Sequence, residues 1–254
     1  MVLTFAASDP TGGAGLQADL LTIAALGCHP LSVVTGLTVQ DTVGVARMFA
    51  LDPAWIRDQA KCLLDDMEVA AFKAGVLGSA ANVRAVSEIV AAHSQAPFVV
   101  DPVLASGRGD PLTADGALGA LRKLILPRTT VLTPNSIEAR RLAAPDTDLA
   151  ACARRMVGDG CKYVLITGTH EPGPEVVNTL YDERGIVRED RWPRLPASYH
   201  GSGCTLASAI AARLAHNADV VEAVREAQKF TWQSLAAGFR AGAGQLLPNR
   251  FFRQ

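Results

Sequence analysis

His200-Gly201-Ser202-Gly203-Cys204-Thr205 is the stretch on which the prediction of the fold depends. Glycines on both sides of a serine let the backbone turn its N–H groups inward, and Leu206, Ile210 and Leu214 then repeat at a helical spacing. Free amides at a helix N-terminus, reinforced by the helix dipole, favour a phosphoryl group that carries negative charge. The stretch therefore predicts an anion-binding turn at the start of a helix, although the same run is also common as a plain loop and cap.

Cys204 lies at the mouth of this predicted turn. Thiolate is favoured where the potential is positive, so we expect the thiol to have a lowered pKa and to be reactive. The alternative is a buried packing residue, because a cysteine followed by small residues is common in protein cores. The surrounding sequence has to decide between these two interpretations.

Alternating strand and helix patterns extend from this stretch through the rest of the chain. Short apolar runs bounded by turn residues predict strands at 2–7, 33–39, 69–74, 98–100, 130–132 and 163–166. Helical periodicity predicts helices at 16–26, 53–65, 80–93, 116–126 and 220–238. The segments 176–181 and 186–191 predict a hairpin, and hence an antiparallel edge. This order is typical of one α/β domain over residues 1–254, a three-layer α/β/α sandwich with a mostly parallel central sheet.

Composition and charge narrow the classes of partner. The 254 residues include 24 Lys plus Arg and 25 Asp plus Glu, a net charge of −1, so we expect no nucleic acid and no anionic membrane as partner. The first residues do not resemble a signal peptide, and no apolar run approaches the length of a membrane span. The five cysteines are widely separated and lack metal-ligand spacing, which favours free thiols in a reducing cytoplasm.

Polar residues follow several predicted strands, at the edge where α/β folds bind ligands. Asp101 ends one strand and Glu138 follows another. Two carboxylates near a phosphate site suggest Mg²⁺, which takes one or two carboxylates and bridges phosphate oxygens. Asn135 and Thr167 follow strands in the same way, and Gln40 offers an amide partner for a heteroaromatic ring. Taken singly, each carboxylate is also explained as a turn or first-turn helix residue.

Four stretches of the chain form a set that resembles a known family in order and spacing. They are Ser8-Asp9-Pro10-Thr11-Gly12-Gly13-Ala14-Gly15-Leu16-Gln17-Ala18-Asp19, Asp101-Pro102-Val103, Thr133-Pro134-Asn135-Ser136-Ile137-Glu138-Ala139 and His200-Gly201-Ser202-Gly203-Cys204-Thr205. The set is similar to that of the hydroxymethylpyrimidine/phosphomethylpyrimidine kinases of thiamine biosynthesis. The resemblance covers nearly the whole chain, and Cys204 makes it specific, since most ribokinase-like enzymes have aspartate there.

This resemblance implies a ribokinase-like fold, a homodimer, and ATP and Mg²⁺ as cofactors. It implies phosphorylation of 4-amino-5-hydroxymethyl-2-methylpyrimidine at its hydroxymethyl group, and then of the monophosphate to the pyrophosphate. It also implies roles for individual residues. The catalytic position is Cys204, with an anion hole formed by Gly201, Ser202 and Gly203. The residues linked with magnesium are Asp101 and Glu138. The nucleotide side comprises Asn135, Thr167 and Arg108, and the pyrimidine side comprises Ala14, Asp19, Gln40, Val76 and Val103.

Two lysines that are common in the family are absent from this chain. Gly107 replaces one of them, and Thr167-Gly168-Thr169-His170 replaces the usual Lys-Gly-Gly-His. We expect Arg108 to supply one of the missing cations, because a guanidinium pairs well with phosphate. Leu21 and the C-terminal Leu247-Pro248-Asn249-Arg250 also depart from the family pattern. These departures bear on nucleotide affinity and on the balance of the two phosphorylations more than on the fold.

The two phosphorylations differ in what they require of Cys204. The first acceptor is an alcohol, and we expect Cys204, as thiolate, to accept its proton. The second acceptor is a phosphate monoester, whose second pKa is about 6, so that it is largely dianionic at neutral pH and needs no base.

Two alternative functions remain open from the sequence. Pyridoxal also presents a hydroxymethyl group on a nitrogen heteroaromatic ring, so a pyridoxal kinase or an enzyme of dual specificity is the first alternative. A non-catalytic sensor that binds a pyrimidine or a nucleotide is the second, and the two absent lysines are its motivation.

Overall fold

A sheet of nine strands runs through the part of the chain described by the structure, a computed structural model covering residues 1–104 and 116–253. The strand order is β3-β2-β1-β4-β5-β6-β7-β8-β9. The strands from β2 to β7 pair in parallel, whereas β3, β8 and β9 are antiparallel to their neighbours. The strands are β1 (Val2–Ser8), β2 (Pro30–Gln40), β3 (Val45–Ala50), β4 (Ala71–Ala74), β5 (Phe98–Val100), β6 (Val131–Leu132), β7 (Tyr163–Thr167), β8 (Glu175–Asp182) and β9 (Gly185–Pro193).

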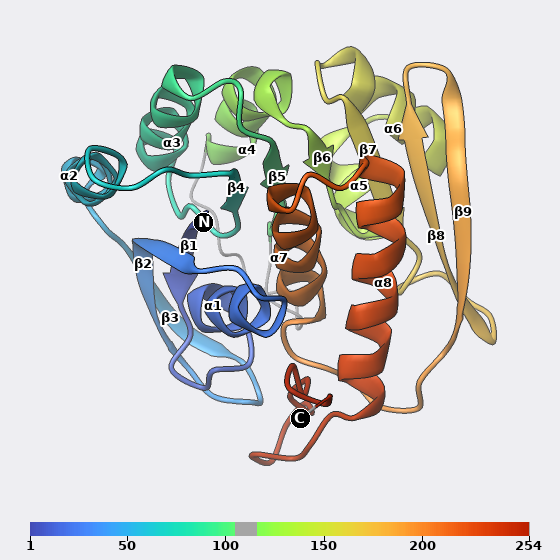
Figure 1. The fold of residues 1–254 in the computed structure, drawn as a ribbon. Helices are drawn as coiled ribbons and strands as arrows, with labels where there is room; N and C mark the ends of the chain where they lie inside the picture. The colour runs from blue at the N-terminus through green and yellow to red at the C-terminus, as the bar shows by residue number, and fades with distance from the viewer. Residues whose placement is uncertain (105–115, 254) are drawn as a thin grey trace.

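Helices cover both faces of this sheet, as Figure 1 shows. On one face α1, α7 and α8 pack together, and Ile23, Ile210 and Val224 share a buried core with the sheet. On the other face the core includes Ile56 of α2 and Met156 of α6. The helices are α1 (Gly15–Ala25), α2 (Pro53–Leu64), α3 (Ala80–Ala92), α4 (Ala117–Ala120), α5 (Ser136–Leu142), α6 (Leu149–Gly158), α7 (Ser202–Ala215) and α8 (Val220–Ala236). The predicted three-layer α/β/α sandwich is therefore confirmed.

The predicted strands form because their apolar runs are buried between the helical layers. In β1 every residue up to Ala7 is buried, as expected for a parallel strand covered on both faces. Lys73 is an exception, because its charged side chain is fully buried in the otherwise apolar β4. A buried ammonium group needs a partner, and the partner of Lys73 belongs to the site described below.

The structure differs from the predicted elements in four places. The edge strand β3, the short helix α5 and the helix α6, whose N-terminus is capped by Asp148, lie outside the predicted set. The helix predicted at 116–126 is irregular: it runs from α4 through a π-helical segment, Leu121–Ile125, into a 3₁₀ turn, Leu126–Arg128. Pro127 explains this ending, since proline lacks the N–H that continues a helix.

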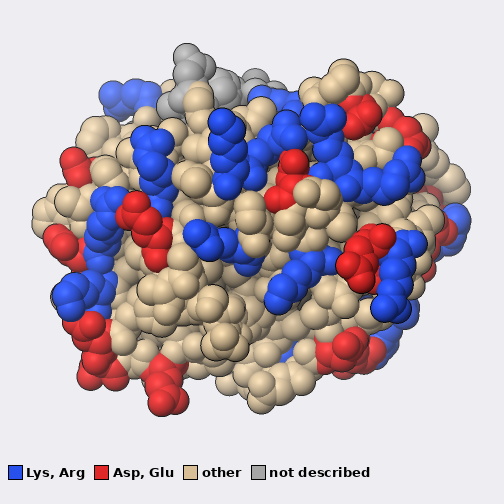
Figure 2. Space-filling view, turned by 90° about the horizontal axis from the view of Figure 1, so that it is seen from above, with Lys and Arg blue, Asp and Glu red and all other residues tan. Residues whose placement is uncertain are grey.

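The surface and the helices agree with the balanced composition. Figure 2, which views the molecule from above, shows Lys and Arg side chains interspersed with Asp and Glu, in line with the net charge of −1. Among the helices of the described ranges, none combines the length and the apolar character that crossing a bilayer requires.

Candidate functional site

The N-terminus of α7 presents backbone amides that no side chain caps. Gly201, the residue before the helix, has φ +81° and no side chain that accepts a hydrogen bond. A Cβ at this position would lie 2.0 Å from the carbonyl oxygen of Gly13, so the site requires glycine. Ser202, Gly203 and Cys204 form the first turn, whose N–H groups and helix dipole favour an anion. The predicted anion-binding turn thus begins a helix of 14 residues.

A second glycine-rich segment packs against this turn. We call residues 9–15 the first glycine loop and residues 200–205 the second glycine loop. Asp9 organises the first loop, because its carboxylate accepts hydrogen bonds from the backbone N–H of Thr11 (2.8 Å) and of Ala14 (2.7 Å). His200 Nε2 donates to the same carboxylate at 2.8 Å and so joins the two loops. Burial raises the pKa of Asp9, but the hydrogen bonds from His200, Thr11 and Ala14 outweigh burial and leave the pKa below its usual value.

Cys204 lies beside Asp101 and the first glycine loop. Its thiol hydrogen-bonds the Asp101 carboxylate, and the backbone N–H of Gly15 hydrogen-bonds its sulfur. Burial raises the pKa of the Cys204 thiol to about 12. Lys73 lowers this pKa, whereas Asp101 and Asp19 raise it. The predicted lowering of the thiol pKa is therefore wrong, because burial and two neighbouring carboxylates outweigh the positive end of the helix.

Lys73 and Asp19 form a fully buried ion pair close to Cys204. The Nζ atom of Lys73 lies 2.8 Å from each carboxylate oxygen of Asp19. The hydroxyls of Thr4 and Ser208 also donate to this carboxylate, at 2.6 and 2.8 Å. Asp19, predicted on the pyrimidine side, thus has its carboxylate enclosed by protein groups and no exposed surface.

Asp101 and Glu138, the predicted magnesium ligands, are both buried. Glu138 belongs to the capping box of α5, in which its Oε2 accepts from the backbone N–H of Asn135 at 3.0 Å. Gly203 leaves room for Asp101, since a Cβ there would lie 3.2 Å from Asp101 Oδ2. Burial raises the pKa of Asp101 to about 6, and burial together with the charge of Asp101 raises the pKa of Glu138 to about 8.

These two carboxylates fit a divalent cation. Burial disfavours the ionised forms of both carboxylates, the charge of Asp101 also disfavours ionisation of Glu138, and a bound cation would offset these effects. Within residues 1–104 and 116–253, no group of three or more His, Cys, Asp or Glu side chains is arranged to hold a metal ion. Two carboxylates completed by water and phosphate oxygens are the coordination that Mg²⁺ commonly has in kinases.

Two of the three residues predicted on the nucleotide side are adjacent. Asn135 and Thr167 form a β-bridge, and the N–H of Thr167 donates to the carbonyl of Pro134 at 3.0 Å. The Asn135 side-chain oxygen caps α5 by accepting from the N–H groups of Ile137 and Glu138. The third residue, Arg108, lies outside the described residues.

Gln40, predicted on the pyrimidine side, has a fixed side-chain orientation at the end of β2. The Thr38 hydroxyl donates to the carbonyl of Ser8 at 2.9 Å, so its oxygen is left to accept from Gln40 Nε2 at 2.6 Å. The carbonyl oxygen of the Gln40 amide is therefore the atom available to a ligand, and it matches the donor character of an exocyclic amino group.

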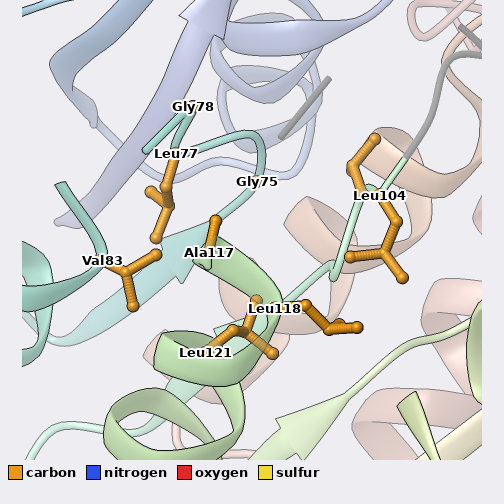
Figure 3. A pocket seen from close by; sticks show the side chains of 9 residues that line it. Gly75, Leu77, Gly78, Val83, Leu104, Ala117, Leu118 and Leu121 are labelled. Carbon is orange, nitrogen blue, oxygen red and sulfur yellow. The ribbon is translucent and has the colours of Figure 1, made fainter. Parts of the chain in front are cut away.

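Val103 lines an apolar hollow at the ends of β4 and β5, with Val76 in the loop beside it. Figure 3 shows the side chains of Leu77, Val83 and Ala117 gathered around this hollow. Its volume of about 10 Å³ holds about one water molecule and is too small for a pyrimidine ring. Ala14 is the N-cap residue of α1, and the roles of Ala14, Val76 and Val103 on the pyrimidine side stay predictions.

Three residues of this region with basic side chains lie outside the predicted set. Lys73 has a sequence signal, since a lysine inside a buried strand pattern indicates a partner. His200 stands in the quoted motif without a predicted role, and its contact with Asp9 spans 191 residues of sequence. Arg250 is separated from its acceptor Gly13 by 237 residues, and no local pattern predicts that contact.

An α/β/α sandwich with an uncapped helix N-terminus facing paired carboxylates defines the class as a ribokinase-like phosphotransferase. The phosphomethylpyrimidine kinase family matches residues 9–249. The hydroxymethylpyrimidine/phosphomethylpyrimidine kinase of Streptomyces coelicolor is 42% identical over 252 residues, which cover 96% of this chain and 91% of that protein. The enzyme of the same name from Salmonella typhimurium is 35% identical over 240 residues (92% and 90%). The chain belongs to the phosphomethylpyrimidine kinase family, as the sequence resemblance predicts.

Solved structures confirm the ribokinase-like fold. Pyridoxal kinase from Staphylococcus aureus, in complex with AMP-PCP and pyridoxal, superposes with a TM-score of 0.89 at 28% identity and covers 98% of this chain and 93% of its own. Phosphomethylpyrimidine kinase from Clostridium difficile superposes with a TM-score of 0.78 at 32% identity (91% and 96%). The fold is thus shared by kinases named for two different compounds, pyridoxal and phosphomethylpyrimidine.

Proposed function

We propose that this chain uses ATP to phosphorylate 4-amino-5-hydroxymethyl-2-methylpyrimidine and then its monophosphate, two steps of thiamine biosynthesis. Membership of the phosphomethylpyrimidine kinase family supports the reaction class. The observation that carries the proposal is the uncapped first turn of α7, which faces Asp101 and packs against the first glycine loop. In this proposal the amides of Ser202, Gly203 and Cys204 stabilise the charge on the moving phosphoryl group.

Cys204 acts in the first step as a relay for the proton of the alcohol. A thiol with a pKa of about 12 is protonated at neutral pH, so it cannot act as a preformed thiolate. Its S–H group already hydrogen-bonds Asp101. The alcohol proton therefore passes to the sulfur while the thiol proton passes to the Asp101 carboxylate. The alkoxide oxygen bonds to the γ-phosphorus of ATP as the bond from that phosphorus to the β–γ bridging oxygen breaks, and ADP leaves.

The remaining predicted residues take supporting roles in this proposal. Asp101 and Glu138 would hold Mg²⁺, Asp101 through the carboxylate oxygen that does not bond the Cys204 thiol, and the cation would neutralise charge on the phosphate oxygens. On the pyrimidine side the Gln40 oxygen accepts from the amino group, Ala14, Val76 and Val103 form the wall, and Asp19 supports them from the buried layer. On the nucleotide side we assign Asn135, Thr167 and Arg108.

An ADP-release assay with Mg²⁺-ATP, run separately with the alcohol and with its monophosphate, tests the proposed function. ADP release that depends on each pyrimidine supports two phosphorylations. Pyrimidine binding by calorimetry without any turnover would instead support the sensor alternative and overturn the proposal.

Pyridoxal phosphorylation is a second candidate, favoured by the TM-score of 0.89 to a pyridoxal kinase. The 42% identity to the hydroxymethylpyrimidine/phosphomethylpyrimidine kinase of S. coelicolor favours the pyrimidine. Steady-state kinetics with both alcohols under the same conditions decide between them, and a larger kcat/KM for pyridoxal would reverse our order of preference.

We further propose that the protein acts in the cytoplasm as a homodimer, each copy being one domain. An exposed apolar patch on β2 and β3 supports self-association: Leu37, Val39 and Phe49 are 51, 52 and 67% exposed, and Leu37 pairs directly with Phe49. The five cysteines are free thiols, which supports a reducing compartment. Light scattering of the wild type and of Phe49→Glu tests the dimer, which the variant should dissociate.

A further inference from the structure

Arg250 is a buried cation that the proposed chemistry does not use. Its side chain lies near the C-terminus of the described chain and is only 4% exposed. Three of its nitrogen atoms donate to acceptors on the two glycine loops. Nη2 donates to Gly13 O at 2.6 Å, Nη1 to Gly12 O at 3.4 Å, and Nε to Thr205 Oγ1 at 3.1 Å. One guanidinium therefore bridges both loops.

The first glycine loop is held from two sides by opposite charges. Its N–H groups are bound by the Asp9 carboxylate, whereas its carbonyl groups at Gly12 and Gly13 are bound by Arg250. Arg250 contacts the second loop at Thr205. The Thr205 hydroxyl accepts a hydrogen bond from Arg250 and donates one to Gly201 O at 2.8 Å. A planar guanidinium with several donors suits this task, because a lysine ammonium does not span acceptors in such a fixed fork.

The segment that carries Arg250 is itself tied to the region of the site. Residues 242–250, which we call the C-terminal strap, pair with residues 198–200: His200 N donates to Leu246 O at 2.9 Å and Leu246 N to Ser198 O at 3.0 Å. Gln245 N donates to Thr42 O at 2.9 Å, in the turn that follows Gln40. The strap therefore contacts the β2–β3 turn and both glycine loops.

We infer that Arg250 is a positioning residue that holds the two glycine loops in register for phosphoryl transfer. This inference rests on the proposed function, in which Ala14 of the first loop borders the pyrimidine and the second loop forms the anion hole. Loss of the bridge lets Gly201 and Gly13 move apart, and displacements of about 1 Å in such sites lower rates by about 10²-fold. Because both steps use the same amides, both should be slowed alike, unlike the step-selective loss expected at Cys204.

The test compares Arg250→Met with Arg250→Lys and with the control Arg253→Met. Arg253 is an exposed arginine three residues beyond the strap, where it contacts the ring of Phe252 and Gln233. For Arg250→Met we expect kcat to fall by about 10–100-fold in both steps with KM values changed less than about threefold. Arg250→Lys should recover part of this loss, and Arg253→Met should match the wild type. A kcat of Arg250→Met within twofold of wild type in both steps would overturn the inference.

Amide hydrogen exchange tests the bridge without reference to activity. In Arg250→Met the N–H groups of Gly12, Gly13, Ala14 and Thr205 should exchange faster than in the wild type and in Arg253→Met. Unchanged exchange there would contradict the bridge. If the wild type turns over neither pyrimidine, the proposed function fails, yet this exchange still decides the bridge.

A second pair of variants covers the case in which Arg250→Met does not fold. Thr205→Val removes the hydroxyl that accepts from Arg250, and Thr205→Ser keeps it. We expect Thr205→Val to lower kcat in both steps by about 10-fold or more and Thr205→Ser to stay near the wild type. Equal rates for the two Thr205 variants would refute the positioning role.

Discussion

The two glycine loops have similar composition but opposite hydrogen-bonding states. In the first loop, side-chain oxygens of Asp9 and Thr11 accept from the N–H groups of Thr11, Gly13 and Ala14. In the second loop, Gly201 precedes α7 and no side chain caps the first turn. A glycine-rich run is therefore a closed scaffold where a neighbouring carboxylate accepts from its amides, and an anion site where none does.

Gly201→Ala should break this comparison most severely. Alanine would have to adopt the φ of +81° that Gly201 has, and its Cβ would lie 2.0 Å from Gly13 O. The backbone amides of the second loop must therefore move. Losing one preorganised donor in such a site costs about 10²–10³ in rate, and we expect kcat to fall by at least that factor. Steady-state kinetics with both pyrimidines measure the loss.

Gly27→Ala is the matched control for backbone strain. Gly27 has the same φ of +81°, but a Cβ there would meet nothing within 4 Å. We expect it to lose about 1–2 kcal/mol of stability, with kcat unchanged. If Gly201→Ala lost no more activity than Gly27→Ala, the second loop would not be the anion site.

Cys204→Ala should separate the two phosphorylations. The alcohol step loses its proton relay, so we expect kcat to fall by about 10²-fold, whereas the monophosphate step should fall less than tenfold because its nucleophile is already ionised. Single-turnover rates with each acceptor measure both effects. Equal losses in the two steps would mean that Cys204 serves the geometry of the second loop rather than proton transfer.

The sequence predicts the layers of the fold well and their irregular parts poorly. Buried apolar runs such as Val2–Ser8 carry their own strand signal, and the hairpin of β8 and β9 follows from its turn. The edge strand β3 lacks that signal because its residues are exposed or half-buried and include Arg47 and Met48. Its pairing with β2 depends on tertiary context, which local propensity does not contain.

The candidate site shows the same limit in its electrostatics. A glycine turn before a helical stripe predicts the start of α7, because both signals are local. The pKa of Cys204 depends on burial, Lys73, Asp101 and Asp19, which approach only in the folded chain, so a local pattern predicts the wrong direction. The bridge from Arg250 to Gly13 is equally non-local, and the sequence shows this arginine only as a departure from a family pattern.

Asp9→Asn should open the scaffold of the first loop. An amide replaces the carboxylate that binds Thr11, Ala14 and His200, so we expect a stability loss of about 1–3 kcal/mol at pH 7 and a smaller, roughly tenfold, loss of kcat/KM. Urea unfolding and kinetics measure the two effects. Asp52→Asn is the control, because asparagine caps α2 as well as aspartate does and should change stability by less than about 0.5 kcal/mol.

The pH dependence of Asp9→Asn has a defined sign. The folded-state pKa of Asp9 lies below its usual value of about 3.8, so its ionised form contributes stability above that pH. The contribution disappears as the pH falls through the lower, folded-state pKa. The stability difference between the wild type and Asp9→Asn should therefore shrink below about pH 4. A difference that stayed constant to lower pH would show that the charge of Asp9 does not hold the loop.

The smallest expected effect concerns the carboxylates beside the second loop. An uncapped loop attracts an anion, whereas Asp101 and Glu138 repel it unless a cation neutralises them. The folded-state pKa of Glu138, about 8, lies above its usual value of about 4.5. The stability that protonated Glu138 contributes is therefore fully present below pH 4.5 and is lost as the pH rises through about 8. Mg²⁺ binds the ionised carboxylates and should oppose that loss.

Thermal unfolding from pH 6 to 8.5, in EDTA and in MgCl₂, measures this effect. In the wild type we expect the increase in Tm caused by Mg²⁺ to be larger at pH 8.5 than at pH 6, by a few degrees. Glu138→Gln keeps an oxygen that accepts from Asn135 N, so the α5 cap survives while the charge is lost. In the variant only Asp101 still titrates near this range, so the increase in Tm caused by Mg²⁺ should be smaller than in the wild type and should change less between pH 6 and pH 8.5. A response equal to that of the wild type would exclude Glu138 from the metal site and leave the repulsion beside the second loop to be relieved by the thiol and Lys73 alone.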